Sequence, residues 1–203
     1  MDAEAICNRL REALPGAAVA FRKNPGASGQ DSILVESDSL CAVCRFLRDT
    51  DDLAFDFLSN VTGIDWPDAS LADKVALAEA AGEEENEDAA PKDGFLEVLY
   101  HLYSTRHQTG PLVLRARTRD RVENAKLASV VSVFRSAEFQ EREIYDLFGV
   151  TFTGHPDLRR ILMWDEFEDH PMRKDYVEPD DYEYEPTPHN AVLEKAKRHY
   201  PAS

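Results

Sequence analysis

The chain has 203 residues, of which 43% are apolar, and a formal net charge of −16. Such a chain can bury one hydrophobic core, so it is not a disordered protein. The negative charge argues against nucleic acid as the main partner and against an anionic bilayer, because both are bound mainly through lysine and arginine.

The compartment is indicated by the apolar runs and the cysteines. No run approaches the roughly 18 apolar residues that a membrane helix needs, and the N-terminus lacks the basic-then-apolar order of a signal peptide. Three cysteines, Cys7, Cys41 and Cys44, are an odd and sparse set for a disulfide framework. We therefore expect a soluble cytoplasmic protein with free thiols.

Two helices and two short strands are predicted before residue 50. Apolar residues at helical spacing predict a helix over residues 3–14. Strands are expected at residues 19–21 and 33–35, on either side of a turn rich in glycine and proline. A second helix follows, with Ser37 or Asp38 as its cap. Its core stripe has four members at helical spacing: Leu40, Val43, Cys44 and Leu47.

The middle of the chain predicts three strands and an insertion. Residues 55–64 are expected to form a strand with Phe55 and Phe57 on one side and a loosened end. Nine acidic residues and only two lysines lie within residues 67–93, which we interpret as an acidic surface insertion, helical over 71–81. Alternating apolar residues predict strands at 95–103 and 112–116, joined by a long loop.

The last third predicts three more helices, the last of them within an irregular end. One apolar helical face is formed by Leu127, Val130, Val131 and Phe134. A helix at 137–148 is ended by Gly149, and prolines then interrupt the chain until a short helix fits at 190–199. The fold class is therefore α+β: a single domain (1–148) with a small mixed or antiparallel sheet packed by helices, then an extended C-terminal arm (149–203).

Two clusters could carry metal or redox chemistry. Cys41 and Cys44 form a CxxC motif, but a metal site needs about four ligands and Cys7 is distant, so two ordinary helix cysteines are favoured. His155 and His170 are each followed by proline and lie near carboxylates that could bind zinc or iron. Their acids lack fixed ligand spacing, so histidines that order loops are favoured over a metal site or a general base.

The helix at 137–148 places a carboxylate on its apolar face. At 100° per residue, Glu141 falls near the middle of that face. A buried carboxylate needs a partner, which Arg159 or Arg160 could supply; alternatively Glu141 reaches solvent past a narrow stripe. The other side of the helix carries Arg142, Glu143 and Asp146 and is either solvated or a contact surface, with Arg142 and Asp146 spaced as an i,i+4 pair.

The segment after this helix combines charges with large apolar residues. A proline-broken segment would expose these apolar residues, and burial against another chain would resolve that. They are Leu158, Ile161, Leu162, Met163, Trp164 and Met172.

The pattern in residues 141–176 is specific. It consists of Glu141-Arg142-Glu143, Asp146-Leu147-Phe148-Gly149, Phe152 to Leu162 and His170 to Tyr176. It resembles the signature of the 30 kDa subunit of respiratory complex I, the proton-pumping NADH:quinone oxidoreductase. Weaker similarity extends upstream to residue 55. The chain departs from the family in the aromatic residues before the signature, in the long acidic stretch and after Tyr176.

The resemblance implies a subunit with no catalytic, cofactor or metal site of its own. It implies a place in the hydrophilic arm, on the cytoplasmic face of the energy-transducing membrane and held there only through the complex. FMN, iron–sulfur clusters and quinone would belong to partner subunits. Residues 141–176 would dock on the large quinone-module subunit and the terminal-cluster subunit. The expected interface residues are Glu141, Arg142, Glu143, Asp146, Gly149, Gly154, His155, Pro156, Asp157, Arg159, Arg160, His170, Pro171, Arg173, Lys174 and Asp175.

Two other functions stay open. An equivalent subunit could serve a related membrane-bound hydrogenase or a quinone reductase fed by another donor. A function of a different class is a stand-alone metalloenzyme that uses His155, His170 and nearby acids.

Overall fold

The computed structural model describes residues 2–24, 26, 29–69 and 93–177. The elements in this part of the chain are α1 (Ala3–Ala13), β1 (Val19–Arg22), β2 (Ser32–Val35), α2 (Ser37–Asp49), β3 (Phe57–Asp68), β4 (Asp93–Ser104), β5 (Thr109–Arg117), β6 (Lys126–Ala128), α4 (Ala137–Phe148) and β7 (Thr151–Thr153). The predicted helices at 71–81 and 190–199 and most of the insertion at 67–93 lie outside the described residues; residues 67, 68 and 93 belong to strands.

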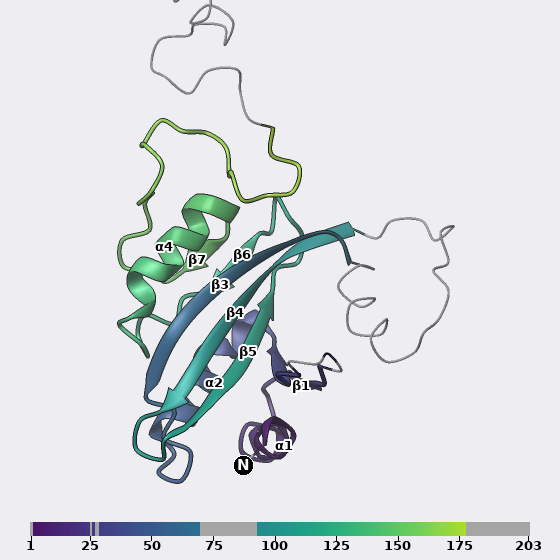
Figure 1. Ribbon diagram of the computed structural model, residues 1–203, viewed down its shortest axis with the longest axis vertical. Helices are drawn as coiled ribbons and strands as arrows, with labels where there is room; N and C mark the ends of the chain where they lie inside the picture. The colour runs from purple at the N-terminus through teal and green to yellow at the C-terminus, as the bar shows by residue number, and fades with distance from the viewer. Residues whose placement is uncertain (1, 25, 27–28, 70–92, 178–203) are drawn as a thin grey trace, which may run out of the picture.

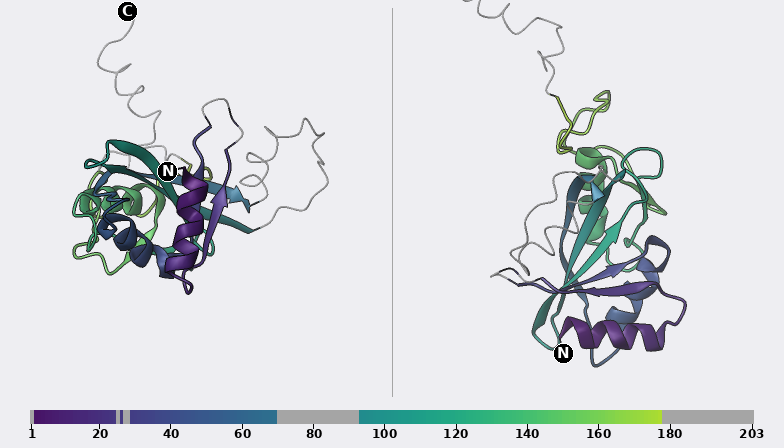
Figure 2. Two further views of the ribbon diagram at one scale, coloured as in Figure 1. Left: turned by 90° about the horizontal axis from the view of Figure 1, so that it is seen from below. Right: turned by 90° about the vertical axis from the view of Figure 1, so that its right-hand side faces the viewer.

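Five strands form a mixed sheet in the order β1-β2-β5-β4-β3. β2 and β5 run parallel, and the other neighbours are antiparallel. A second small sheet pairs β6 with β7 in parallel. In Figures 1 and 2, α1 lies at one end of the molecule, and the segment after α4 lies at the other. The α+β class with a mixed sheet is confirmed, whereas the proposed division at residue 148 stays a prediction.

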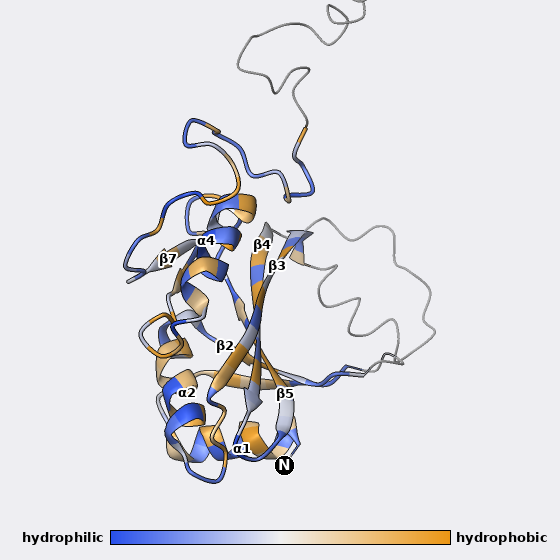
Figure 3. Cartoon of the chain, turned by 60° about the vertical axis from the view of Figure 1, so that its left-hand side comes forward, coloured by the Kyte–Doolittle hydropathy of each residue, from blue (hydrophilic) through white to orange (hydrophobic). Residues whose placement is uncertain are grey.

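The core lies between the inner face of the sheet and the helices. Leu96, Val98, Tyr100 and Leu102 alternate along β4, and each is fully buried, as predicted from their spacing. The stripe of α2 is buried as well and belongs to the same hydrophobic cluster, together with residues of α1 and α4. Figure 3 shows hydrophobic residues along the strands, and mostly hydrophilic residues with a few hydrophobic positions after β7.

The outer face of β4 carries a buried carboxylate. Glu97 is 0% exposed, and it accepts hydrogen bonds from Arg115, from Arg117 and from the indole nitrogen of Trp66. Burial opposes ionisation of this group, but the hydrogen bonds and charges of Arg115 and Arg117 outweigh it and lower the pKa of Glu97. The network ties β3, β4 and β5 together on the side of the sheet away from the core.

The predicted helix through Leu127–Phe134 is wrong. Leu127 lies in β6 opposite Phe152 of β7, and only a single turn follows, in which Val133 and Phe134 donate to the carbonyl of Val130. The apolar residues of this segment are mostly buried, but their spacing comes from a strand end followed by a turn. The strand partner lies beyond the next helix, where local periodicity carries no signal.

The predicted strand at 55–64 is correct in position but not in its bounds or facing. The strand runs from Phe57 to Asp68 with a bulge after Leu58. Phe55 precedes it and is 5% exposed, whereas Phe57 is 49% exposed, so the two do not share a side. Gly63 does not loosen the strand, since it pairs with Val98 of β4. The ring of Phe148 comes within 2.6 Å of where a Cβ on Gly63 would be. The glycine therefore marks a close approach of α4.

Two local details also differ from the expectation. Glu36, not Ser37 or Asp38, stands at the N-cap of α2 and makes no side-chain cap bond; the hydroxyl of Ser37 instead accepts from the backbone nitrogen of Ala128 at 3.0 Å. The hairpin between β4 and β5 is tighter than predicted, because Ser104 pairs directly with Thr109. Among the described residues, no helix combines the length and hydropathy of a membrane span.

Candidate functional site

Helix α4 positions the site. It packs along β3, where the backbone nitrogen of Val61 donates to the side-chain oxygen of Gln140 at 2.7 Å. The helix ends at Gly149, whose φ of 78° lies in the left-handed region. A Cβ on Gly149 would come within 2.5 Å of the imidazole of His170 and 2.6 Å of the guanidinium of Arg173. Glycine is therefore required here both by the backbone turn and by the close approach of the returning chain.

Glu141 lies on the core side of α4 and is 0% exposed. The hydroxyl of Ser129 donates to its carboxylate at 2.6 Å, and the backbone nitrogen of Val130 donates at 2.8 Å. The expectation of burial is correct, and both the expected arginine partner and the solvent alternative are wrong. Burial outweighs the two hydrogen bonds and raises the pKa of Glu141 to about 7.

The surroundings of Glu141 contain the two cysteines of the CxxC motif. Cys41 donates its thiol to the carbonyl of Ser129 at 2.9 Å, and Cys44 is buried. Both are free thiols whose pKa is raised, chiefly by burial, so they stay protonated at neutral pH. The hydroxyl of Tyr100 is also buried and has no hydrogen-bond partner within the described part of the chain. These residues are core components of α2 and β4.

Asp146 lies on the opposite side of α4 and is also 0% exposed. One carboxylate oxygen accepts from three consecutive backbone nitrogens, those of Ile161 at 3.0 Å, Leu162 at 2.7 Å and Met163 at 2.9 Å. The other accepts from Arg160 at 2.6 Å. Burial opposes ionisation, but the backbone hydrogen bonds and Arg160 outweigh it and lower the pKa of Asp146. Of the side of α4 that was expected to be either solvated or a contact surface, Arg142 and Asp146 are thus buried under residues 154–177, here named the arm loop, whereas Glu143 is exposed.

Arg142 and Asp146 have separate partners. The guanidinium of Arg142 donates to the carbonyls of Arg159 at 3.1 Å and Arg160 at 2.9 Å, so the expected i,i+4 pair is replaced by contacts to the arm loop. Arg142 is 5% exposed. Arg159 forms an exposed ion pair with Asp157 at 3.0 Å. The two arginines expected beside Glu141 are therefore both used elsewhere.

The two histidines hold the arm loop to α4. His155 contacts the carbonyl of Glu138 through Nε2 at 2.9 Å, and its Nδ1 accepts from the backbone nitrogen of Asp157 at 3.0 Å. His170 donates from Nδ1 to the carbonyl of Asp146 at 3.0 Å. Burial lowers the pKa of His170, which favours the neutral ring. Both histidines therefore order the arm loop through hydrogen bonds to the backbone, which was the favoured interpretation. The described residues contain no cluster of three or more metal-binding side chains.

A second set of contacts fastens the end of the arm loop. Arg173 donates to the carbonyl of Phe148 at 2.7 Å. Buried Asp65 accepts from Arg121 at 2.7 Å and from the backbone nitrogen of Lys174 at 2.7 Å, and Arg121 also bonds Asp175 at 2.8 Å. Sequence reasoning missed Asp65 and Arg121. The alternation of β3 could have flagged Asp65 as an inward carboxylate, but nothing local identifies Arg121 as its partner.

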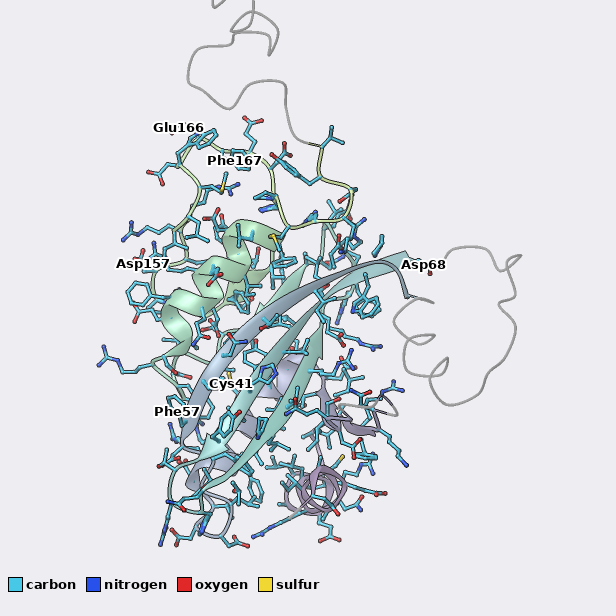
Figure 4. The ribbon with its side chains drawn as sticks, in the orientation of Figure 1. Cys41, Phe57, Asp68, Asp157, Glu166 and Phe167 are labelled. Carbon is cyan, nitrogen blue, oxygen red and sulfur yellow. The ribbon has the colours of Figure 1, made fainter. Side chains whose placement is uncertain are left out.

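The remaining predicted interface residues lie at the surface of the same region. Glu143, Gly154, Pro156 and Lys174 are exposed, and Pro171 is half-buried. Five large apolar residues of the arm loop are exposed: Ile161 (38%), Leu162 (61%), Trp164 (44%), Met172 (53%) and Val177 (81%). Leu158 and Met163 are half-buried. In Figure 4, Glu166 lies at the outer end of the arm loop, and Asp157 lies beside α4.

Helix α4 and the arm loop form a fixed surface on an α+β domain, and the sequence of residues 141–176 that builds it is typical of one protein family. The chain belongs to the family described as the respiratory-chain NADH dehydrogenase 30 Kd subunit, whose model matches residues 33–182. The resemblance found in residues 141–176 is thereby confirmed.

Relatives with assigned names agree. The chain is 35% identical over 171 residues to the NADH-quinone oxidoreductase C subunit of Salinispora tropica, covering 84% of this chain and 60% of that protein. It is 33% identical over 175 residues to the corresponding C subunit of Roseiflexus sp., covering 86% and 84%. The chain thus spans about 60% of the length of the Salinispora relative.

A chain of another respiratory complex shares the fold. It is a chain of the membrane-bound sulfane sulfur reductase, an archaeal respiratory membrane complex, with a TM-score of 0.58 and 21% identity over 98% of this chain and 91% of that chain. At this identity the likeness concerns the fold alone.

Proposed function

We propose that the chain is a non-catalytic structural subunit in the hydrophilic arm of a proton-translocating NADH:quinone oxidoreductase. It supports electron transfer from NADH through FMN and iron–sulfur clusters to quinone, with these groups held by partner subunits. The family and the relatives that bear the NADH-quinone oxidoreductase name support this assignment. The subunit lies on the cytoplasmic face of the membrane and is held there through the complex.

The arm loop carries the proposal. The fold buries the charged side chains of Arg142 and Asp146, which bind the arm loop, yet Leu162 in that loop stays 61% exposed. Burying charged groups is costly unless they are fully hydrogen-bonded. A fold that holds a loop in this way while leaving its apolar side chains in water has the properties of a docking surface. We assign it to the large quinone-module subunit and the terminal-cluster subunit.

The histidines weigh against a stand-alone metalloenzyme. Both ring nitrogens of His155 are engaged with the backbone, and Nδ1 of His170 is engaged as well. A metal ligand needs a free nitrogen lone pair, so His155 would have to break a loop contact to bind one.

Gentle detergent extraction of membranes tests the proposal. The chain should migrate with other hydrophilic-arm subunits in a native gel, and the purified chain alone should show no NADH oxidase or quinone reductase activity. A chain that is monomeric in a low-salt extract, with no partner retained, would contradict the proposal.

A complex with another electron donor is the second candidate, because a chain of a different respiratory membrane complex shares the fold. The native-gel band that contains the chain separates the two. NADH-dependent quinone reduction and bound FMN in that band support the first candidate. An intact band that lacks NADH activity and is reduced by another donor supports the second.

A further inference from the structure

We infer that residues 161–169, here named the loop tip, form an acid-rimmed apolar plug whose partner is an apolar groove bordered by lysine and arginine on another subunit. The inference rests on the proposed function, which supplies the complex, and adds the chemistry of the partner surface. It depends on three observations: exposed apolar side chains, a fixed backbone and carboxylates that form no ion pair with any described residue.

The apolar side chains of the loop tip are large and adjacent. Ile161 is 38% exposed, Leu162 61% and Trp164 44%. Isolated exposed apolar residues are ordinary, but a cluster at the end of a projecting loop is typical of an interaction site. Tryptophan and leucine so placed would fill a pocket on the partner, and aromatic anchors of this type commonly supply most of the binding energy of an interface.

The loop tip is held in one conformation before any partner binds. Asp146 fixes its first residues through the backbone nitrogens of Ile161, Leu162 and Met163. Beyond them, Trp164 packs edge-on against Phe167 with ring centroids 4.8 Å apart. Because the loop is already ordered, docking loses less conformational entropy than it would with a mobile loop. The buried network of α4 thus presents the exposed side chains in a preorganised geometry.

Exposed carboxylates follow these apolar side chains along the loop tip. Four acidic residues of the loop tip are exposed: Asp165, Glu166, Glu168 and Asp169. Within the described part of the chain, none of their carboxylates forms an ion pair, and the nearby guanidinium of Arg160 is directed to Asp146 and to the carbonyl of Asp169. Figure 4 shows Glu166 at the outer end of the arm loop, away from the sheet.

The negative charge of the loop tip indicates which kind of partner surface fits it. A surface with four negative charges is complementary to a basic rim, which would speed association and reject acidic surfaces. An anionic bilayer would repel the same loop tip, although tryptophan and leucine alone could suit a membrane interface. The observations therefore favour a basic protein groove over lipid.

Charge reversal tests the rim. The full-length tagged chain replaces the native copy in its host, and the fraction in the assembled complex is measured on native gels after washes at increasing salt. Glu166→Lys with Glu168→Lys should lower that fraction about tenfold at low salt, and Glu166→Gln with Glu168→Gln should give a smaller loss. The matched control, Glu12→Lys with Glu123→Lys, makes the same charge change at exposed positions outside the loop tip and should behave like the wild type.

Cross-linking identifies the groove. A photo-reactive phenylalanine derivative in place of Leu162 should join the chain to a peptide of another subunit that contains lysine or arginine beside apolar residues. The same group in place of Val122, which is 76% exposed, is the control and should not join that peptide. A cross-link to lipid, or to a peptide rich in acidic residues, would overturn the inference.

The outcomes distinguish a failure of the proposed function from a failure of the loop-tip inference. If the wild-type chain enters no complex, the proposed function and this inference both fail. If the wild type assembles and the Glu166 and Glu168 variants assemble equally well at every salt concentration, the inference alone fails. Melting of each purified variant shows that a lost interaction is not lost folding.

Discussion

Replacement of Glu141 by glutamine should flatten the pH dependence of stability. The pKa of this carboxyl is raised from 4.5 to about 7 in the folded chain, chiefly by burial. The folded state therefore holds the proton more tightly than the unfolded state. The associated stability is fully present below pH 4.5 and is lost as the pH rises through about 7. At about 1.4 kcal/mol for each pKa unit, the loss approaches about 3 kcal/mol.

Glutamine is a close mimic of the protonated carboxyl. Its oxygen can accept from the backbone nitrogen of Val130, and its amide can donate to the hydroxyl of Ser129, the two groups that Glu141 contacts. Urea unfolding of the full chain between pH 5 and pH 8 should therefore show similar stability for Glu141→Gln and the wild type at pH 5. At pH 8 the variant should be more stable by up to about 3 kcal/mol.

The matched control is Glu143→Gln on the exposed side of the same helix, which should follow the wild type at every pH. His170 is present in all three proteins. Its lowered pKa removes stability as the pH falls, which is the opposite direction, and this contribution cancels in the differences. Parallel curves for the wild type and Glu141→Gln would refute the reasoning, because they would mean that ionised Glu141 is tolerated in the core.

Three further tests concern the arm loop, two of them with a matched second variant. Asp146→Ala should cost about 3 kcal/mol in urea unfolding, since it leaves Arg160 and three backbone nitrogens without their acceptor, and limited proteolysis should then cut residues 154–177 faster than in the wild type. Gly149→Ala should lower the free energy of unfolding more than the control Gly154→Ala. Both glycines have a positive φ, at 78° and 85°, but of the two only Gly149 has close neighbours. Equal losses would exclude the contact with the returning chain. Arg160→Ala should lower the melting temperature of the free chain, because the side chain of Arg160 is only 12% exposed. The side chain of Arg159 is 66% exposed, so Arg159→Ala should affect complex assembly only. Equal losses of melting temperature would contradict this distinction.

The sequence predicts those parts of the fold that local periodicity controls. The stripe of α2 and the alternation of β4 are both correct, because each residue's facing depends on its own helix or strand. The helix expected at Leu127–Phe134 fails since β6 is defined by β7, a strand beyond α4. The same segment supplies the partner that was missed for Glu141, because the backbone nitrogen of Val130, just after β6, donates to its carboxylate.

The candidate site was predicted as a location rather than as a set of contacts. Its exposed apolar residues and loop-ordering histidines follow from composition and proline spacing. The burial of Arg142 and Asp146 does not, because it depends on the arm loop folding back over α4. Contacts between segments that are distant along the chain leave no periodic pattern in the sequence.

The opposite placement of Glu141 and Asp146 on α4 has a consequence for assembly. One residue bonds the exit of β6 and the other bonds the start of the loop tip, and five residues of helix separate them by only about 7.5 Å along the axis. A copy in which α4 is rotated or shifted out of its core contacts would therefore carry its exposed apolar loop in the wrong position. In the proposed complex, a partner that recognises the loop tip would therefore bind only copies whose interior has packed correctly.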